Sequence, residues 1–402
     1  MNANVIGNPV RRPSAQRDRC RRADAGTIGF VSTYPPTKCG LATFTASLAR
    51  ALAGSRRSGA VGVVSCVDEP GLIAYPPEVV GEWTRGSSVS LEAAATVLDT
   101  FDSVVVQHEF GLFGGDDGTE ILDLLSRLRT RAIVVLHTVC ACPSRDQRTI
   151  VEQLARSAHR LVAQSAVARK RLLDLHTIDP ACVAVVQHGA RRNIGPRTHR
   201  PTESRSRPTI LTWGLLGPGK GIEFAIDAIA LLRDLDPRYV VLGETHPNVV
   251  RQFGETYRES LHARARALAV EDCVEFKNGY RDTASILAEI READVVLLPY
   301  LSRDQVVSGV LVEAIASGKP VVATAFPHAI ELLGEGSGLI VPHEDAAAIA
   351  DALRVFLTDH ELAAQAAAIA RRQAALLTWE NVARSYLRLT KEAQHATVYI
   401  SR

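Results

Sequence analysis

Short apolar runs alternate with amphipathic stretches along most of this chain, and this rhythm constrains the fold more than any other feature. Valine-rich runs bounded by polar residues are typical of buried strands, and the stretches between them have the spacing of helices. In the first half the expected strands are Thr27–Thr33, Val61–Val67, Ser103–Gln107, Ala132–His137, Leu161–Gln164 and Val183–Gln187. Helices are expected at Leu41–Leu52, Thr119–Leu128 and Arg148–Ala158. This order predicts an α/β fold with a parallel sheet covered on both faces.

The same rhythm begins again after a polar interruption. Residues 191–208 are basic, contain proline and have no periodic apolar face, so we interpret them as a linker. Beyond them the expected strands are Thr209–Trp213, Tyr239–Leu242, Val274–Phe276, Val295–Pro299, Pro320–Ala323 and Gly338–Val341. The expected helices are Ile222–Asp234, Val249–Leu268, Thr283–Ala293, Gly309–Ser317, Ala346–Leu357 and Thr378–Ala393. Two such halves predict two Rossmann-like, doubly wound domains that face a ligand-binding cleft.

The length of 402 residues also fits two domains of ordinary size. We assign residues 26–190 to the first domain and 209–375 to the second. Residues 376–402 are expected to form a C-terminal helix that crosses back to the first domain. Residues 1–25 hold six arginines and almost no apolar stretch, so they are expected to be a disordered basic tail.

The amino-acid composition argues against several classes of binding partner. A net charge of +2 does not require nucleic acid, and an aromatic content of 5% argues against a stacking platform for single strands. No apolar run approaches the roughly 18 residues needed to span a bilayer, although a peripheral contact with a membrane through basic patches stays open. The seven cysteines are odd in number and irregularly spaced, which favours free thiols in a reducing cytoplasm. His137, Cys140 and Cys142 are close in sequence, but no second ligand cluster completes a tetrahedral metal site.

The segment 294–324 is the most informative about function. An apolar strand is followed by a polar loop, and Gly309 then opens an apolar helix. The N–H groups of Gly309, Val310 and Leu311 have no partner within the helix, so they are expected to face phosphate oxygens. Glu313 lies one turn further on, where its carboxylate is placed to accept hydrogen bonds from vicinal sugar hydroxyls. The alternative is that Glu313 is a solvated helix residue, which its apolar neighbours disfavour.

A glycine-rich turn follows the first strand of the second half. Residues 213–221 read WGLLGPGKG, and Gly214, Gly219 and Lys220 match the pattern G-x-x-x-x-G-K. Gly221 stands where a P-loop needs Ser or Thr to hold Mg²⁺, so a magnesium-dependent nucleotide hydrolase is disfavoured. A glycine turn with a lysine still suits a diphosphate, and an ordinary turn with an exposed lysine is the competing interpretation.

Two residues of the first half stand at the end of a strand or the start of a helix. Gly40 opens the first helix and leaves room for a phosphate or a sugar, although many turns of this kind contain glycine. His137 ends an apolar strand, and strand carboxyl ends point at the ligand crevice of doubly wound folds. There His137 is placed to hydrogen-bond a sugar hydroxyl or to position an acceptor; the competing interpretation is a structural histidine. We interpret His188, which follows the last strand of this half, as part of the hinge.

With these motifs the chain resembles the GT-B glycosyltransferases of the retaining family 4 type, the glycosyl transferases group 1. The resemblance covers residues 27 to about 393 and is most specific between Asp304 and Thr324, where the family has Glu, seven residues, Glu. Glu313 is the second of these residues. Gln305 replaces the first with a neutral amide, and Leu215 stands where the family commonly has an arginine next to Gly214.

The resemblance implies a donor site for a nucleotide sugar such as GDP-mannose or UDP-glucose, with no obligatory metal and a carbohydrate or lipid-linked acceptor. It places Gly40 near the donor phosphate, His137 near the reacting sugar and Glu313 at the ribose hydroxyls. By the same resemblance, residues 244–246 lie in the donor cleft, and Tyr280 lies near the nucleobase.

The expected reaction is transfer of a hexose to an acceptor hydroxyl with retention. Gly219, Lys220 and the N-terminus of the helix at 309–311 would bind and stabilise the leaving diphosphate. Gln305 would hold the donor sugar and cannot be a carboxylate nucleophile, which fits a same-face mechanism. Two other interpretations stay open: a sugar-nucleotide epimerase of the same fold, and a non-catalytic nucleotide-sugar sensor.

Overall fold

Val104 and Val106 point to one face of the first sheet and Val105 to the other, and all three are fully buried. Strand side chains alternate between faces, so a continuous valine run requires apolar cover on both sides. A computed structural model describes residues 26–55, 59–193, 195, 207–279 and 281–400, with side chains up to 394. The interpretations of residues 1–25, of Tyr280 and of most of the linker therefore lie outside the described residues.

The first sheet is parallel throughout, with strand order β3-β2-β1-β4-β5-β6-β7. Its strands are β1 Ile28–Ser32, β2 Val61–Val67, β3 Val79–Thr84, β4 Ser103–His108, β5 Ala132–Leu136, β6 Arg160–Ala163 and β7 Val183–Val185. The connecting helices are α2 Gly40–Ala53, α3 Ser88–Leu98, α4 Glu120–Arg127, α5 Arg145–Ser157 and α6 Ala166–Leu175, with short 3-10 turns η1 Asp116–Gly118 and η2 Pro180–Cys182.

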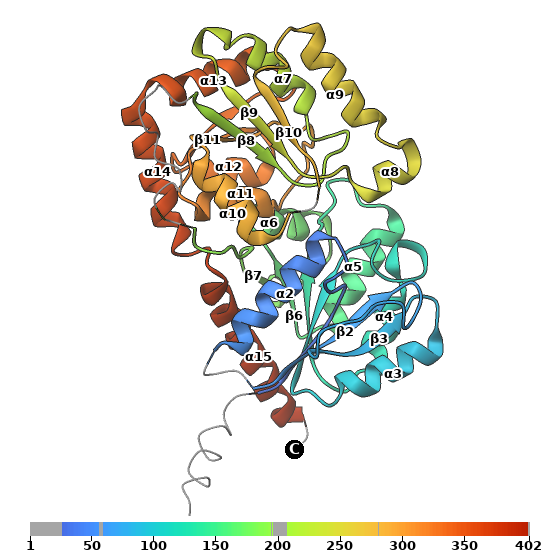
Figure 1. Ribbon diagram of the computed structural model, residues 1–402. Helices are drawn as coiled ribbons and strands as arrows, with labels where there is room; N and C mark the ends of the chain where they lie inside the picture. Colours follow the sequence, from blue (N-terminus) through green and yellow to red (C-terminus); the bar gives the residue numbers. More distant parts are fainter. Residues whose placement is uncertain (1–25, 56–58, 194, 196–206, 280, 401–402) are drawn as a thin grey trace, which may run out of the picture.

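The second sheet is also parallel, with strand order β10-β9-β8-β11-β12-β13. Its strands are β8 Thr209–Trp213, β9 Arg238–Leu242, β10 Val274–Lys277, β11 Val295–Leu298, β12 Val321–Thr324 and β13 Gly338–Val341. Its helices are α7 Ile222–Ala230, η3 Arg233–Leu235, α8 Pro247–Phe253, α9 Thr256–Ala267, α10 Thr283–Glu292, α11 Gly309–Ala316, α12 Pro327–Leu333, α13 Ala346–Thr358 and α14 His360–Ala374. The two lobes lie one above the other in Figure 1. The predicted α/β class with two doubly wound sheets is confirmed.

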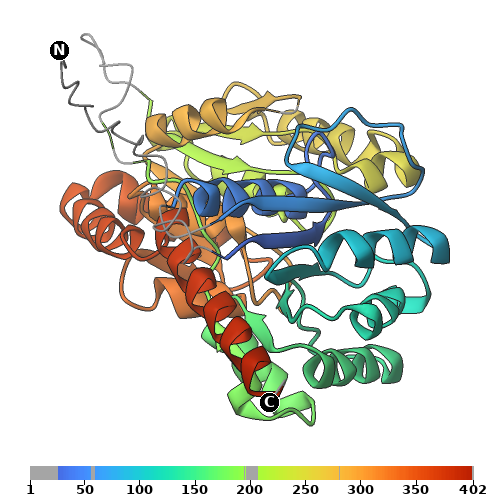
Figure 2. The same ribbon diagram turned by 90° about the horizontal axis from the view of Figure 1, so that it is seen from below.

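The chain passes between the lobes twice, at neighbouring positions. Ala190 forms a parallel bridge with Thr378: its N–H donates to the Leu377 carbonyl at 2.8 Å, and its carbonyl accepts from the Trp379 N–H at 3.2 Å. The final helix, α15 Trp379–Ile400, then lies against α2 and the first sheet, as Figures 1 and 2 show. Its buried Tyr386 joins the core between α2 and that sheet.

Several elements differ from the sequence prediction. The single helix expected at Val249–Leu268 is two helices, α8 and α9, because Gly254 has φ 61° and ψ −142° and ends the first. The edge strand β3 was not predicted because most of its side chains are partly exposed and give no buried apolar run. Helices α3, α6, α12 and α14 were not predicted either.

Strand order reverses between β1 and β4 in the first sheet and between β8 and β11 in the second. Loops at the carboxyl ends of such strand pairs form the ligand crevice of doubly wound sheets. The turn 214–221 follows β8 and the loop 299–308 follows β11, so both predicted motifs lie at the switch point of the second sheet. α2 follows β1 and faces them from the other lobe.

Candidate functional site

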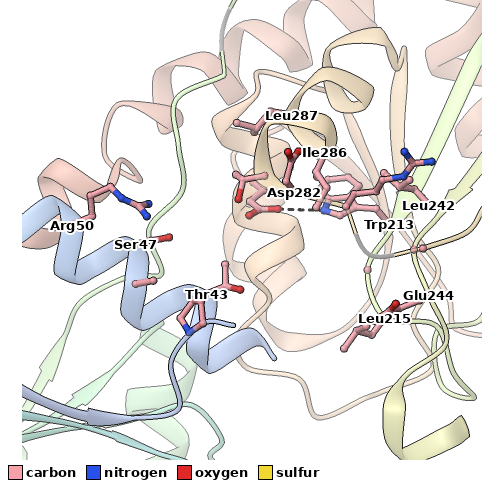
Figure 3. Close-up of a pocket in the computed structure, with 18 residues that line it drawn as sticks. Thr43, Ser47, Arg50, Trp213, Leu215, Leu242, Glu244, Asp282, Ile286 and Leu287 are labelled. Atoms are coloured by element: carbon pink, nitrogen blue, oxygen red, sulfur yellow. Dashed lines mark hydrogen bonds between the residues drawn. The ribbon is translucent and has the colours of Figure 1, made fainter. Parts of the chain in front are cut away.

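A cavity of about 330 Å³ separates α2 from the carboxyl edge of the second sheet. Figure 3 shows Thr43, Ser47 and Arg50 along one side of α2, opposite Trp213. Their spacing of four and three residues puts them on one helix face. These three residues were not identified from the sequence, although polar residues at this spacing in an apolar helix are a recognisable signal. The opposite wall comes from β8, β9, α10 and α11.

Glu313 on α11 lines this cavity with its carboxylate. The Trp213 indole N–H donates to its Oε2 at 3.2 Å, the bond dashed in Figure 3. Burial raises the pKa of Glu313 to about 6, and the Trp213 hydrogen bond opposes that rise. Glu313 is half-buried, and a carboxylate in such a wall that keeps unused acceptor capacity is suited to binding vicinal hydroxyls. Glu313 is therefore not a solvated helix residue.

The glycine turn after β8 is defined by backbone geometry. Gly214, Gly219 and Gly221 have φ of 128°, 95° and 66°, a range that L side chains rarely adopt. A Cβ on Gly221 would lie 1.8 Å from the Pro299 carbonyl oxygen, so no Ser or Thr fits there. This excludes the P-loop arrangement on steric grounds. A Cβ on Gly219 would meet nothing within 4 Å.

Lys220 has its ammonium 4.2 Å from the centre of the Tyr300 ring. Tyr300 is 1% exposed and stacks on Phe326. Leu215, where the resemblance has an arginine, lines the cavity with an apolar side chain instead. Lys220 is therefore the cation that this turn contributes.

Two N–H groups remain available at the N-terminus of α11, and not the three expected from the sequence. Ser308 caps the helix: its Oγ accepts from the Leu311 N–H at 3.3 Å and its carbonyl from the Val312 N–H at 3.2 Å. Within the described residues, no protein acceptor faces the N–H of Gly309 or Val310. An anion at this N-terminus would therefore be bound by Gly309 and Val310, with Leu311 supporting the cap.

Gln305 belongs to a loop that His328 holds in place. The Gln305 side-chain amide donates to the Val307 carbonyl at 3.0 Å. The backbone N–H of His328 donates to the backbone carbonyl of Gln305 at 3.2 Å. The Ser308 N–H donates to His328 Nδ1 at 2.9 Å. Gln305 also lines a second cavity, of about 520 Å³, together with Asp304 and His137.

His137 has both ring nitrogens engaged. Nε2–H donates to Gln107 Oε1 at 2.7 Å, and Nδ1 accepts from Gln164 Nε2 at 3.0 Å. Both glutamines are fully buried, and burial lowers the pKa of His137 to about 3, with smaller contributions from His188 and His108. His137 is therefore a neutral wall of the second cavity with no nitrogen left for a proton transfer.

Gly40 begins α2, and a Cβ built on it would meet nothing within 4 Å. The preceding loop crosses the cleft, where Lys38 Nζ lies 3.5 Å from Glu244 Oε1. Glu244 lines the first cavity, as the resemblance implied, whereas His246 caps α8 through a bond from the Asn248 N–H at 3.1 Å. Gly40 thus faces open space at the start of α2, two residues after the lysine of the cross-cleft ion pair.

Direct contacts also hold the lobes together beside the second cavity. Both oxygens of Glu331 on α12 accept from the N-terminus of α6, at 2.9 Å from Ala166 N and 2.7 Å from Val167 N. Ser165 Oγ donates to the Val306 carbonyl at 2.7 Å, and an Arg171 N–H donates to the Asp304 carbonyl at 2.7 Å. The loop that carries Gln305 is therefore fixed by both lobes.

The described ranges hold no group of three or more His, Cys, Asp or Glu side chains placed for a metal ion. They also contain no helix long and apolar enough to cross a membrane.

Residues 197–373 match the family described as glycosyl transferases group 1. D-inositol 3-phosphate glycosyltransferase from Kineococcus radiotolerans is 30% identical over 266 residues, covering 60% of this chain and 59% of the relative. The protein of the same name from Corynebacterium glutamicum is 30% identical, with 62% of each chain covered. The chain thus spans about three-fifths of the length of the curated relatives it matches.

Solved structures share the fold over about nine-tenths of this chain. Anabaena HepE in complex with UDP superposes with a TM-score of 0.71 at 17% identity, covering 91% of this chain and all of that one. Sucrose-phosphate synthase from Thermosynechococcus elongatus gives 0.70 at 18% identity, with 92% of this chain and all of that one covered. These structures confirm the predicted GT-B fold, and residues 197–373 match the glycosyl transferases group 1 family, as the resemblance implied.

Proposed function

We propose that this chain is a glycosyltransferase that moves a hexose from a nucleoside diphosphate sugar to an acceptor hydroxyl with retention. One arrangement carries the proposal: the turn with Lys220 follows β8, α11 follows β11 on the other side of the switch point, and Glu313 of α11 lines the first cavity. In this arrangement Glu313 accepts from the ribose hydroxyls, and the diphosphate lies between Lys220 and the N–H groups of Gly309 and Val310. UDP and UDP-glucose occupy the related fold of HepE, which supports a nucleotide-sugar donor.

The leaving diphosphate gains negative charge as the glycosidic bond breaks. Lys220 and the α11 N-terminus stabilise that charge, and a group of this kind is typically worth about 3 kcal/mol of transition-state stabilisation. We propose that these groups act without an obligatory metal. Dialysis against a chelator should leave the rate unchanged, and loss of activity that Mg²⁺ or Mn²⁺ restores would contradict this part of the proposal.

The acceptor is assigned to the second cavity, where Gln305, Asp304 and His137 meet. Gln305 has no carboxylate to form a covalent intermediate, and His137 has no free nitrogen to act as a base. A same-face mechanism remains, in which the leaving phosphate takes the acceptor proton. The named relatives act on inositol phosphate, and we propose a carbohydrate or lipid-linked hydroxyl as the acceptor class here.

We propose a cytoplasmic location and no nucleic-acid partner. The described cysteines, Cys39, Cys66, Cys140, Cys142, Cys182 and Cys273, are all free thiols, which suits a reducing compartment.

The decisive experiment measures nucleoside diphosphate release from a panel of sugar nucleotides, with inositol phosphate and neutral sugars as acceptors. Lys220→Ala and Glu313→Ala should abolish release from the preferred donor. Lys170→Ala is the matched control, because Lys170 is 76% exposed on α6 and pairs with Asp174. Donor binding without release under any condition would favour a nucleotide-sugar sensor. Absence of both binding and release would reject the proposal.

A further inference from the structure

The ring of His188 is held rigidly at the junction of the two lobes. Its Nδ1–H donates to the Gly189 carbonyl at 2.7 Å. Phe44 packs edge-on against the ring, with centroids 5.0 Å apart, and Trp379 lies at 5.6 Å. Because Nδ1 carries the proton, Nε2 presents a lone pair.

That lone pair lies against the first turn of α11. A Cβ built on Gly309 would lie 2.9 Å from His188 Nε2 and 3.1 Å from Cε1. Gly309 does not have a positive φ, so its backbone conformation does not require glycine. The absence of a side chain is what allows the imidazole to approach the helix N-terminus. His188 therefore borders the position where Gly309 and Val310 offer their N–H groups.

The ionisable groups around His188 come from several elements. His137 follows β5, α12 carries His328, and α11 carries Glu313 one turn further along. Phe44 of α2 and Trp379 of α15 contribute uncharged rings. Arg50 lines the first cavity and also a separate cavity at the hinge, which Glu380 lines as well. Burial lowers the pKa of His188 to about 4, so its ring is neutral at neutral pH while the site is empty.

We propose that His188 takes up a proton at Nε2 when the donor binds, and so becomes a second cation beside the leaving diphosphate. This inference rests on the proposed function. A neutral Nε2 would direct its lone pair at a phosphate oxygen, which is repulsive. Protonation from solvent converts that contact into a charge-assisted N–H···O hydrogen bond. No covalent bond forms at His188, and the proton returns to solvent when the diphosphate leaves.

This arrangement accounts for a departure seen in the sequence. Leu215 removes the cation expected next to Gly214, and Lys220 alone then faces the diphosphate from the turn. His188 approaches from the other lobe, so its charge is available only when the two lobes and the donor are together. Donor affinity should accordingly weaken as pH rises. Between the pKa of His188 in the empty site and its pKa in the occupied site, the loss should be about tenfold per pH unit.

The test is calorimetry with an intact nucleotide sugar and no acceptor, in two buffers with different heats of ionisation. An intact nucleotide sugar is the right probe because each of its phosphates has one ester and one anhydride bond, so each keeps a single strongly acidic group that stays ionised near neutral pH. The wild type should take up about one proton per donor bound. His188→Gln should bind about 10- to 100-fold more weakly, since it loses a charge-assisted bond, and should take up none. His360→Gln, an exposed histidine at the start of α14, should match the wild type.

Each other result has a definite meaning. Burial raises the pKa of Glu313 to about 6, so Glu313→Gln is measured in parallel and should retain the proton uptake on donor binding. Donor binding without uptake in the wild type, or uptake that persists in His188→Gln, would overturn the role of His188 and leave the glycosyltransferase proposal standing. If no donor binds the wild type, both proposals fail. His188→Asn replaces His188→Gln if the latter does not unfold cooperatively.

Discussion

The ammonium of Lys220 lies over the face of Tyr300, 4.2 Å from the ring centre. Tyr300 is almost fully buried and stacks on Phe326, so the ring is a rigid support. A cation held over an aromatic face is stabilised by the ring quadrupole and loses freedom to turn into solvent. Tyr300 is therefore a positioning residue: it holds Lys220, the cation that we propose binds the diphosphate.

Replacing Tyr300 by Leu should weaken donor binding about 2- to 30-fold, because a cation–π contact is worth about 0.5–2 kcal/mol. Tyr300→Phe should bind normally, since it keeps the aromatic face. Its hydroxyl has no hydrogen-bond partner in the described part of the chain, so its loss should not destabilise the fold. Donor titration of both variants checks the prediction. Equal weakening in the two variants would show that the ring face is not what matters.

Gly309→Ala should abolish or strongly reduce donor binding, because the added methyl group would collide with His188 at 2.9 Å. Gly111→Ala provides a matched control: Gly111 lies in the exposed turn after β4, and a methyl group there meets nothing within 4 Å. We expect Gly111→Ala to fold and bind donor within about twofold of the wild type. Thermal unfolding and donor titration of both variants separate a packing effect from a binding effect. Equal behaviour of the two variants would contradict the close approach of His188.

Local patterns were enough to predict the two sheets and the position of the proposed diphosphate site. Valine runs identify the buried strands, and the glycines around Lys220 and before Glu313 identify turns at strand ends. The edge strand β3 escaped prediction because it is largely exposed. Helix α12 escaped because it spans only Pro327–Leu333, too short to show a periodic face.

Relationships between distant segments were not readable from the sequence. Nothing in the local pattern links Gly309 to His188, or Glu331 to the N-terminus of α6, because these contacts depend on how the two lobes face each other. The capping of Leu311 by Ser308 was within reach, since serine before a helix is a familiar cap. The sequence prediction of three free N–H groups was therefore one too many, because the Ser308 side chain accepts from the N–H of Leu311.

Glu331→Ala should weaken the contact between the lobes, because it leaves the N–H groups of Ala166 and Val167 without their carboxylate. Loss of a helix cap costs about 0.5–2 kcal/mol, so the free energy of unfolding should fall by about 1 kcal/mol. Glu335→Ala is the control, since Glu335 is exposed and, within the described ranges, accepts a hydrogen bond only from Gln373, at 3.2 Å. Denaturant unfolding of both variants gives the comparison. Equal losses in the two would mean that the cap contributes nothing beyond an ordinary surface contact.

We expect ionised Glu313 to lower the free energy of unfolding, although its carboxylate helps to bind the proposed donor. Burial raises its pKa from 4.5 to about 6, so the folded protein holds this proton more tightly than the unfolded chain does. The stabilisation from the protonated carboxyl is complete below pH 4.5 and is lost as pH rises through about 6. Above that pH the ionised carboxylate costs up to about 2 kcal/mol of unfolding free energy, at about 1.4 kcal/mol per pH unit.

Glu313→Gln removes that cost and keeps an oxygen to accept from Trp213. The variant should therefore be more stable than the wild type at neutral pH, by up to about 2 kcal/mol, and the difference should vanish in acid. Its donor affinity should nevertheless fall, because an amide is a weaker acceptor for ribose hydroxyls than a carboxylate. Denaturant unfolding on both sides of the transition, combined with donor titration, tests the two effects together. A variant less stable than the wild type at neutral pH would contradict the prediction. It would show that burial does not raise the pKa of Glu313 and that the ionised carboxylate stabilises the fold.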